Sequence, residues 1–384
     1  MSRMDELIAE LAPAGVRHVA LSEVADYSST RVDAAELDET SFVGVDNLVA
    51  NKRGRVDATY LPNTARLTAY EPGDILLGNI RPYLKKVWRA TNLGGCSGDV
   101  LAIRIEPRSQ QDLDPEFLYY LLSSDDFFAY NMQHAKGAKM PRGNKTAILN
   151  YRIPVPPIEV QREIVRILDH FTELEAELEA ELEARRRQYA HYRAVLLTLT
   201  PMTGVRPLGE LAQNLDSKRK PVTKDARSPG DVPYYGASGI VDHVSDYIFD
   251  GDYLLVSEDG ANLLARSTPI AFSISGKTWV NNHAHILEFE TYAERRFVEY
   301  YLNSIDLAPY ISGAAQPKLN KANLNRIPVP APSLSEQKRI VSILDKFETL
   351  ANSLSGGLPA ELQARRKQYE YYRDKLLTFA EAAA

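Results

Sequence analysis

Apolar residues recur at every third or fourth position along one stretch of the chain, from Ile164 to Leu199. This spacing is typical of one face of an α-helix. Pro156 and Pro157 stand just before the stretch and cannot lie inside a helix. The pattern predicts a helix over about 159–199, about 60 Å long at 1.5 Å per residue. So long a helix cannot bury its apolar stripe against a small domain, so it needs a partner helix.

The predicted helical stretch is present twice in the chain. Residues 152–174 read RIPVPPIEVQREIVRILDHFTEL, and residues 326–350 read RIPVPAPSLSEQKRIVSILDKFETL. Residues 184–199 (ARRRQYAHYRAVLLTL) likewise match residues 364–379 (ARRKQYEYYRDKLLTF). Self-similarity of this length indicates a duplication, so the second copy supplies the partner helix. Gly356, Gly357 and Pro359 should break or kink that second helix.

The regions before the two helical stretches correspond more faintly. Their matching segments are PGDILL (72–77) with DGDYLL (250–255), and GAKMPRGNKTAIL (137–149) with GAAQPKLNKANL (313–324). Short runs such as VLAIRI (100–105) and HAHILEF (283–289) are strand-like, and short amphipathic segments follow at 115–128 and 293–305. We therefore expect an α+β fold with an internal repeat, divided into 1–152, 153–200, 201–326 and 327–384.

Composition narrows the class of protein. The chain has 384 residues, 44% hydrophobic and 25% charged, with a net charge of −6, which is the balance of a folded protein. Bulk charge therefore does not favour nucleic acid, although one basic face remains open. Cys96 is the only cysteine, which excludes intrachain disulfides and all-thiolate metal sites. The chain shows neither a membrane-spanning run nor an apolar signal core, so we expect a cytoplasmic protein without membrane contact.

Catalytic motifs are missing. Gly276-Lys277-Thr278 ends like a phosphate-binding loop, but Ala271 stands where that loop requires glycine. The chain contains neither G-x-S-x-G nor a glycine-rich strand–turn–helix, and it lacks the Asn-Pro-Pro-aromatic type of motif of adenine methyltransferases. We therefore predict no catalytic residue.

Histidines and acidic residues were weighed as metal or nuclease sites. His283 and His285 alternate on a predicted strand, but no cysteine or carboxylate close in sequence completes a metal set. Asp74, Glu258 and Asp259 follow strand-like runs, yet acidic turn residues beside glycine explain them more simply. The sequence favours no metal site.

Basic and polar residues gather at corresponding places in both halves. Cations hold phosphates, while Arg, Asn, Gln and Ser side chains can contact base edges. Such clusters are often plain surface, but their recurrence before each helical stretch favours a function. The candidate DNA-binding residues are Arg81, Lys85, Lys136, Lys139, Arg142, Lys145, Lys218, Arg219, Tyr234, Tyr235, Ser238, Gln316, Lys318 and Lys321.

These features resemble the specificity subunit of type I restriction–modification systems, over about residues 15–380. The most specific marks are the duplicated IPVPP-x(3)-Q-x(2)-I-V-x-I-L-D, with two added residues in the second copy, and the duplicated ARR[RK]QY-x-x-YR. A third mark is the tract PYYGASGI…DGDYLLVSEDGAN…WVNNHAHIL, which is similar to a recurrent type of target recognition domain.

The resemblance implies two α/β target recognition domains, each reading half of a split target in double-stranded DNA. Two long helices, packed antiparallel as a coiled coil with a pseudo-two-fold axis, would set their spacing. Two modification subunits would dock on exposed faces of 161–199 and 337–379 and carry S-adenosylmethionine and adenine N6-methylation. Restriction subunits would add ATP- and Mg-dependent translocation and cleavage for host defence. This chain itself would hold no cofactor.

Two other functions stay open from the residues alone. One is a nuclease or methyltransferase whose site escapes motif reading. The other is a coiled-coil adaptor whose variable domains bind proteins. A further hypothesis concerns the local repeat LEAELEAELEAR from Leu174 onward, which is either simple helix-forming sequence or a segment that tunes the spacer.

Overall fold

The computed structural model describes residues 3–198, 204–313, 316–353 and 355–382. It divides into a first unit, residues 1–177 and 363–384, and a second unit, residues 178–362. Both units mix helix and sheet, which confirms the predicted α+β class.

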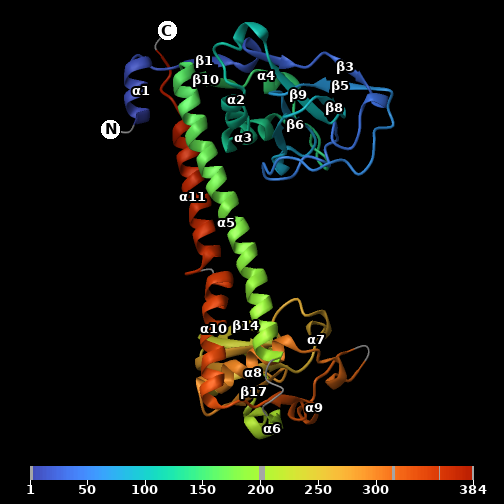
Figure 1. The fold of residues 1–384 in the computed structure, drawn as a ribbon, viewed down its shortest axis with the longest axis vertical. Coiled ribbons are helices and arrows are strands. Elements are labelled where there is room, and N and C mark those ends of the chain that lie inside the picture. The colour runs from blue at the N-terminus through green and yellow to red at the C-terminus, as the bar shows by residue number, and fades with distance from the viewer. Residues whose placement is uncertain (1–2, 199–203, 314–315, 354, 383–384) are drawn as a thin grey trace. The chain divides into compact units, whose positions relative to one another are not determined.

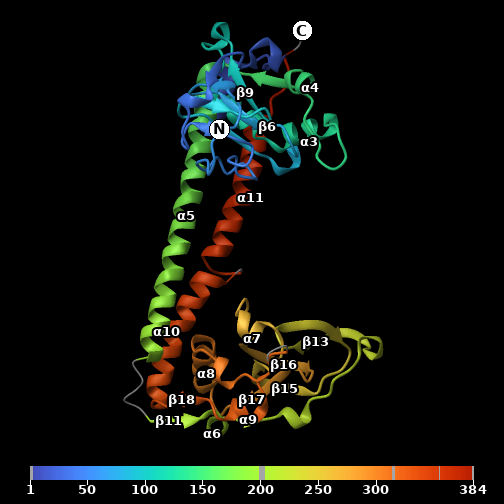
Figure 2. The same ribbon diagram turned by 90° about the vertical axis from the view of Figure 1, so that its right-hand side faces the viewer.

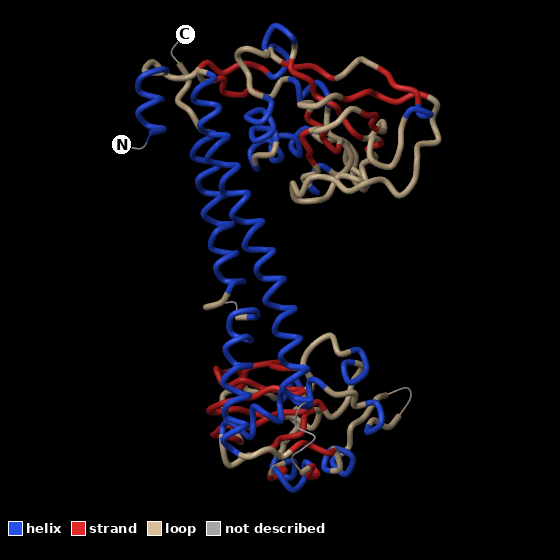
Figure 3. Tube along the Cα trace, viewed as in Figure 1, coloured by secondary structure: helices blue, strands red, loops and turns tan. Residues whose placement is uncertain are grey.

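The first unit contains short strands and helices joined by many loops (Figures 1 and 3). In chain order they are α1 (Arg3–Leu11), β1 (Arg17–Ala20), β2 (Ala25–Tyr27), β3 (Arg31–Asp33), β4 (Phe42–Val43), β5 (Arg66–Tyr70), β6 (Ile75–Gly78), β7 (Val87–Arg89), β8 (Gly94–Cys96), β9 (Val100–Ile105), α2 (Pro115–Leu122), α3 (Asp125–His134), α4 (Lys145–Leu149) and β10 (Arg152–Val155).

The strands of the first unit form two four-stranded sheets, ordered β2-β9-β6-β7 and β3-β5-β8-β4, and a separate pair, β1-β10. Alternation along β9 sends Leu101 and Ile103 into the core that includes α2 and α3, while Ala102 enters a second apolar cluster. Both faces of this strand are therefore buried, which explains its uninterrupted apolar sequence.

The second unit contains one six-stranded sheet, ordered β12-β17-β15-β16-β13-β14, and a pair, β11-β18. Its elements are β11 (Val205–Pro207), α6 (Leu208–Leu211), β12 (Gln213–Asn214), β13 (Pro229–Gly236), β14 (Gly239–Val244), β15 (Phe249–Ser257), α7 (Asn262–Ala265), β16 (Ala271–Val280), β17 (Ala284–Glu288), α8 (Tyr292–Ser304), α9 (Lys321–Asn325), β18 (Pro328–Pro330) and α10 (Leu334–Asn352). Helix α8 packs between this sheet and α10 (Figure 2).

The long helix predicted over about 159–199 is α5, Ile158–Thr198, of 41 residues. The second helix, predicted to pair with it, is interrupted around Gly356 and Gly357. It therefore forms two helices, α10 and α11 (Leu358–Leu377). A side chain at Gly357 would place its Cβ 2.3 Å from the carbonyl oxygen of Thr349, so this turn requires glycine. Among the described residues, no helix combines the length and apolar character needed to span a membrane.

Helix pairing is visible within each unit. In the first unit, Phe171 of α5 stacks on Tyr372 of α11 with ring centroids 5.8 Å apart, and Glu175 pairs with Arg366 at 2.6 Å. The residue numbers of these contacting pairs rise along α5 and fall along α11, so the two helices run antiparallel in this unit. In the second unit, Tyr192 of α5 stacks on Phe347 of α10 at 5.2 Å.

The amphipathic segment expected over 115–128 is divided between two helices, α2 and α3. Ser124 causes the division, because its hydroxyl accepts a hydrogen bond from the Phe127 amide at 3.1 Å and begins a new helix. Serine is a strong N-cap residue because it satisfies an amide that has no partner inside the helix.

Gln161 fixes the start of α5 to the rest of the first unit. Its side chain is fully buried and accepts a hydrogen bond from the Asp114 amide at 2.9 Å. It also donates to the carbonyls of Asp112 and Pro156, each at 2.7 Å. The residue that repeats it, Gln337, donates to Pro332 at 2.9 Å, and its buried Oε1 has no partner among the described residues.

Replacing Gln161→Leu should lower the free energy of unfolding by about 2–4 kcal/mol, because three backbone groups would lose a buried partner. Gln337→Leu is the matched control and should cost under about 1 kcal/mol, since one bond is lost and an unsatisfied acceptor is removed. Urea unfolding, followed by hydrogen exchange at the Asp114 amide, measures both. Equal losses in the two variants would contradict this account.

Candidate nucleic-acid interface

Two loops, one in each unit, are closed by the same backbone hydrogen bonds. In loop A, residues 136–142, the amides of Lys136 and Arg142 donate to each other's carbonyls at 2.9 and 2.8 Å. In loop B, residues 312–318, Ser312 and Lys318 exchange the same two bonds at 2.8 Å each. The similar sequences found before each helical stretch therefore form similar structures.

The second position of each loop is a glycine with positive φ. The values are +100° at Gly137 and +85° at Gly313, a region that side chains disfavour. After each loop an asparagine, Asn144 or Asn320, accepts amide hydrogen bonds and begins the short helix α4 or α9. These local rules of turn and cap explain why unlike sequences keep the same closing hydrogen bonds and the same start of the following helix.

Both loops are held against the end of a central strand. The Gly143 amide donates to the Asn79 carbonyl at 2.9 Å just after β6, and the Leu319 amide donates to the Glu258 carbonyl at 2.8 Å just after β15. The sheets therefore position the loops, and the side chains of the loops are free to differ.

Basic side chains surround loop A. Arg142 is 55% exposed, with Nε 3.1 Å from the Asp99 carboxylate, and Lys145 lies over the Tyr27 ring at 5.9 Å. Lys136 and Lys139 are exposed. Half-buried Arg81 joins the group through its backbone, because its amide donates to the Pro141 carbonyl at 2.7 Å.

Lys85 is bound differently, in an ion cluster around Asp125. The carboxylate of Asp125 accepts from Lys85 at 2.6 Å, Lys52 at 2.8 Å and Arg373 at 3.0 Å. Burial opposes ionisation of Asp125, but the hydrogen bonds from Lys52 and Lys85 outweigh it and hold the pKa of this carboxyl well below its usual range. Asp125 therefore joins three cations, of which the buried Arg373 also pairs with Asp374 at 2.8 Å.

The candidates of the second unit that reach the surface lie on loop B, at the start of α9, on strand β13 and on two turns. Lys318 is 51% exposed, with Nζ 3.2 Å from the Glu258 carboxylate. Tyr235 is half-buried and packs near the Phe272 ring at 6.1 Å. The remaining exposed residues are Lys218, Ser238, Gln316 and Lys321.

Tyr234 is buried and Arg219 is part-buried, so either could contact DNA directly only if the structure opened. We therefore revise the DNA-contacting role expected of these two residues. Tyr234 is 1% exposed, and its hydroxyl bonds the backbone of Val222. Arg219 is part-buried, with its guanidinium 2.6 Å from Glu258 and bonded to the Ala284 carbonyl at 2.8 Å. Both residues support the fold around the candidate surface.

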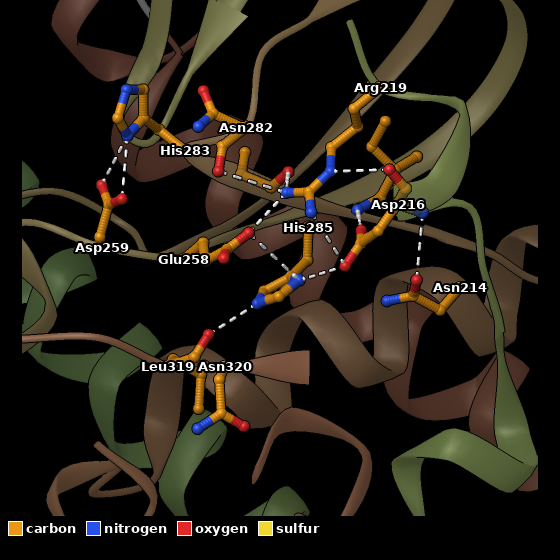
Figure 4. A network of polar contacts seen from close by, with 12 residues as sticks. Asn214, Asp216, Arg219, Glu258, Asp259, Asn282, His283, His285, Leu319 and Asn320 are labelled. Carbon is orange, nitrogen blue, oxygen red and sulfur yellow. Dashed lines mark hydrogen bonds and ion pairs between the residues drawn. The ribbon is translucent and has the colours of Figure 1, made fainter. Parts of the chain in front are cut away.

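A polar network under loop B was missed from the sequence (Figure 4). His285, on β17, is buried and lies 2.6 Å from Asp216, while exposed His283 bonds Asp259 at 2.9 Å. No carboxylate close in sequence completes a metal set with these histidines, but the structure brings one carboxylate to each ring from elsewhere in the chain. Asp216 lies about 70 residues away in the chain, so sequence spacing gave no signal.

The network could be mistaken for a metal site. Asp216, Glu258 and His285 each offer a ligand atom, all within 4.8 Å of one another. However, Arg219 and Lys318 already supply positive charge to the carboxylates. We therefore interpret the group as an ion network. The other acidic residues considered for a nuclease are also paired, Asp74 with Arg104 and Asp259 with His283.

Comparison with known proteins identifies the family. Residues 89–184 and 203–364, about two thirds of the chain, match the profile of the type I restriction modification DNA specificity domain. The chain belongs to this family.

Two relatives illustrate the range of similarity. A putative type I restriction enzyme specificity subunit of Haemophilus influenzae is 41% identical over 180 residues, covering 46% of each chain. The specificity subunit of the Escherichia coli enzymes EcoR124I and EcoR124II is 33% identical over 266 residues, covering 60% of this chain and 65% of that one. The matched region thus spans about half of the first relative and just under two thirds of the second.

Solved structures show the same fold. The type I restriction–modification S subunit from M. genitalium has a TM-score of 0.57 at 18% identity, covering 94% of this chain and 96% of that one. The HsdS subunit from Thermoanaerobacter tengcongensis has a TM-score of 0.52 at 21% identity, covering 96% and 97%.

Gly143→Ala should loosen loop A. The new Cβ would meet the side-chain oxygens of Asn131 and Asn79, both on buried side chains, at 2.6 and 2.7 Å. We expect a loss of about 1–3 kcal/mol in stability and faster hydrogen exchange at the Arg142 amide. Gly98→Ala is the control, because its Cβ would meet no atom within 4 Å. Undisturbed exchange in the Gly143 variant would refute the close contact.

Proposed function

We propose that the chain is the non-catalytic DNA sequence-recognition subunit of a type I restriction–modification complex. The main support is that a chain of this family carries two loops with one backbone frame and different side chains. One frame with two sets of side chains fits two half-sites of unlike sequence in one split target.

The residues around the loops have the chemistry that such recognition needs. Lys136, Lys139 and Arg142 around loop A, and Lys318 and Lys321 at loop B, can hold phosphates, while Gln316 and Ser238 can contact base edges. Arg81, Lys85, Lys145, Lys218 and Tyr235 extend the two surfaces. Tyr234 and Arg219 act by supporting the second surface from within.

The carboxylates beside the loop cations limit affinity. Arg142 faces Asp99 at 3.1 Å, and Lys318 faces Glu258 at 3.2 Å. A phosphate must compete with these carboxylates, so each contact contributes less than a free cation would. We infer that the chain alone binds DNA weakly and that partner subunits add phosphate contacts.

The proposal assigns a task to each segment. Residues 1–152 and 201–326 are the target recognition domains, and residues 153–200 and 327–384 set their spacing and dock two modification subunits. Those subunits supply S-adenosylmethionine and methylation, and restriction subunits supply ATP- and Mg-dependent cleavage. The chain works in the cytoplasm, where its DNA lies. A protein-binding adaptor or an enzyme is the alternative. Activity of the chain alone would favour an enzyme, and an absence of salt-dependent DNA binding both alone and with modification subunits would favour an adaptor.

Arg142→Gln should weaken recognition at one half-site by about 1–3 kcal/mol, and Lys318→Gln should do the same at the other. Methylation mapping in a host that carries the complete system measures each half-site. Arg108→Gln and Arg206→Gln are controls, because these exposed arginines lie outside both loops and pair with Glu106 and Glu210. Equal weakening of both half-sites by one substitution would count against the proposal.

Inserting one further LEAE tetrapeptide after Glu181 tests the spacer. Four residues lengthen a helix by about 6 Å, so the unread gap between half-sites should grow by at most about two base pairs of about 3.4 Å. The same four residues inserted between exposed Gln110 and Gln111 serve as a control and should leave the gap unchanged. Methylation mapping reads the gap directly, and an unchanged gap in the helix variant would discard the spacer role.

A further inference from the structure

The buried His285 ring faces a hydrogen-bond acceptor at each of its nitrogens. Nδ1 lies 2.6 Å from a carboxylate oxygen of Asp216, and Nε2 lies 2.7 Å from the Leu319 carbonyl oxygen (Figure 4). A carbonyl oxygen and an ionised carboxylate accept hydrogen bonds and cannot donate them. Both contacts are hydrogen bonds only if each ring nitrogen carries a proton.

Asp216 is held in the ionised form that this arrangement needs. Burial opposes its charge, but His285, the Ile286 amide and the charge of Arg219 together outweigh burial, so the pKa of Asp216 is lowered. Its other oxygen accepts from the Ile286 amide at 3.0 Å, which fixes the carboxylate in place. Protonated Asp216 paired with neutral His285 is therefore the disfavoured arrangement.

The charges around the ring are balanced. Glu258 lies 3.8 Å from Nδ1, and it also binds Arg219 at 2.6 Å and Lys318 at 3.2 Å. Arg219 in turn lies 3.4 Å from Asp216. The charged groups around the ring are thus two carboxylates and two cations, so a protonated His285 gives the network one net positive charge, and its nearest counter-charge is Asp216 at 2.6 Å.

His285 holds the end of loop B. The Leu319 carbonyl that it binds directly follows Lys318, and the Leu319 amide is fixed to Glu258. Asn320, the next residue, begins α9. His285 therefore helps to fix the backbone at the point where the chain leaves loop B, next to Lys318.

We propose that His285 is a doubly protonated positioning residue that fixes the backbone at Leu319, next to Lys318, for recognition of the second half-site. This inference rests on the proposed function of loop B. Among the described residues of the first unit, no charged ring occupies the corresponding place. The Asn79 amide bonds the Asp99 carbonyl as the Glu258 amide bonds that of His283, so the residue two positions further on, equivalent to His285, is the apolar Leu101. The effect should therefore be confined to one half-site.

Selective ¹⁵N-histidine labelling of the full chain tests the protonation state. A nitrogen–proton correlation spectrum should show protons on both ring nitrogens of His285, assigned by the signal that His285→Gln removes. A ring nitrogen without a proton would overturn the proposal. This measurement does not depend on DNA, so it stands even if the proposed function fails.

Half-site recognition tests the positioning role. In the complete system, His285→Gln should reduce methylation roughly tenfold at targets that depend on the second half-site and leave the first half-site unchanged. The two donor hydrogens of glutamine lie on one nitrogen and cannot reproduce the two opposed bonds of the ring. His283→Gln is the matched control two residues away and should change neither. Equal effects of the two variants would overturn the proposal.

Asp216→Asn is the conservative variant that separates positioning from a general folding defect. Its amide can donate to an unprotonated Nδ1 while its oxygen keeps the bond from Ile286, so a neutral His285 could still bind Leu319. We expect second-site methylation to be retained, with one ring proton lost from the spectrum. A loss as large as in His285→Gln would count against the proposal. If the unsubstituted system modified no split target, the proposed function would fail instead.

Discussion

The backbone bonds that close each loop and fix it to the end of a central strand are the constraint on which the candidate interface depends. Because amides and carbonyls make these bonds, the frame in loops A and B requires little more than a glycine at the second position and an asparagine cap after the loop. The side chains at most other positions can change without altering these closing bonds. This arrangement allows a duplicated domain to acquire two specificities while keeping one fold.

The two loops share the same closing backbone bonds, but the buried residues beneath them differ. Under loop A lie Asn79, Asn131 and Gly143 in close contact, and the side-chain oxygens of both asparagines have no hydrogen-bond partner among the described residues. Under loop B lies the ion network around His285, in which the described groups pair closely. Loop A therefore depends on a tight steric fit, whereas loop B depends on charge. The two units should respond differently to substitutions beneath their loops.

The sequence predicted most of the fold because its signals are local or repeated. Helix α5 follows from apolar spacing, and its interrupted partner follows from two glycines. Loops A and B could be recognised in the sequence because the internal repeat aligns the segments that contain them. Tyr234 and Arg219 could not be placed in this way, because burial depends on residues distant in the chain. From sequence alone an arginine is expected at the surface. Arg219 is instead part-buried, because it pairs with two carboxylates, those of Asp216 and Glu258.

The balance of charge at the loops favours selectivity over affinity. Each central cation has a carboxylate at about hydrogen-bond distance, Arg142 with Asp99 and Lys318 with Glu258. The pairing fixes the direction of a long side chain and so reduces the entropy lost when it meets DNA. It also weakens attraction to any phosphate, because the carboxylate must be outcompeted. A net charge of −6 has the same effect over the whole chain. If the chain acts as proposed, binding to random DNA is thereby disfavoured, and a site is held only where base contacts add to the phosphate contacts.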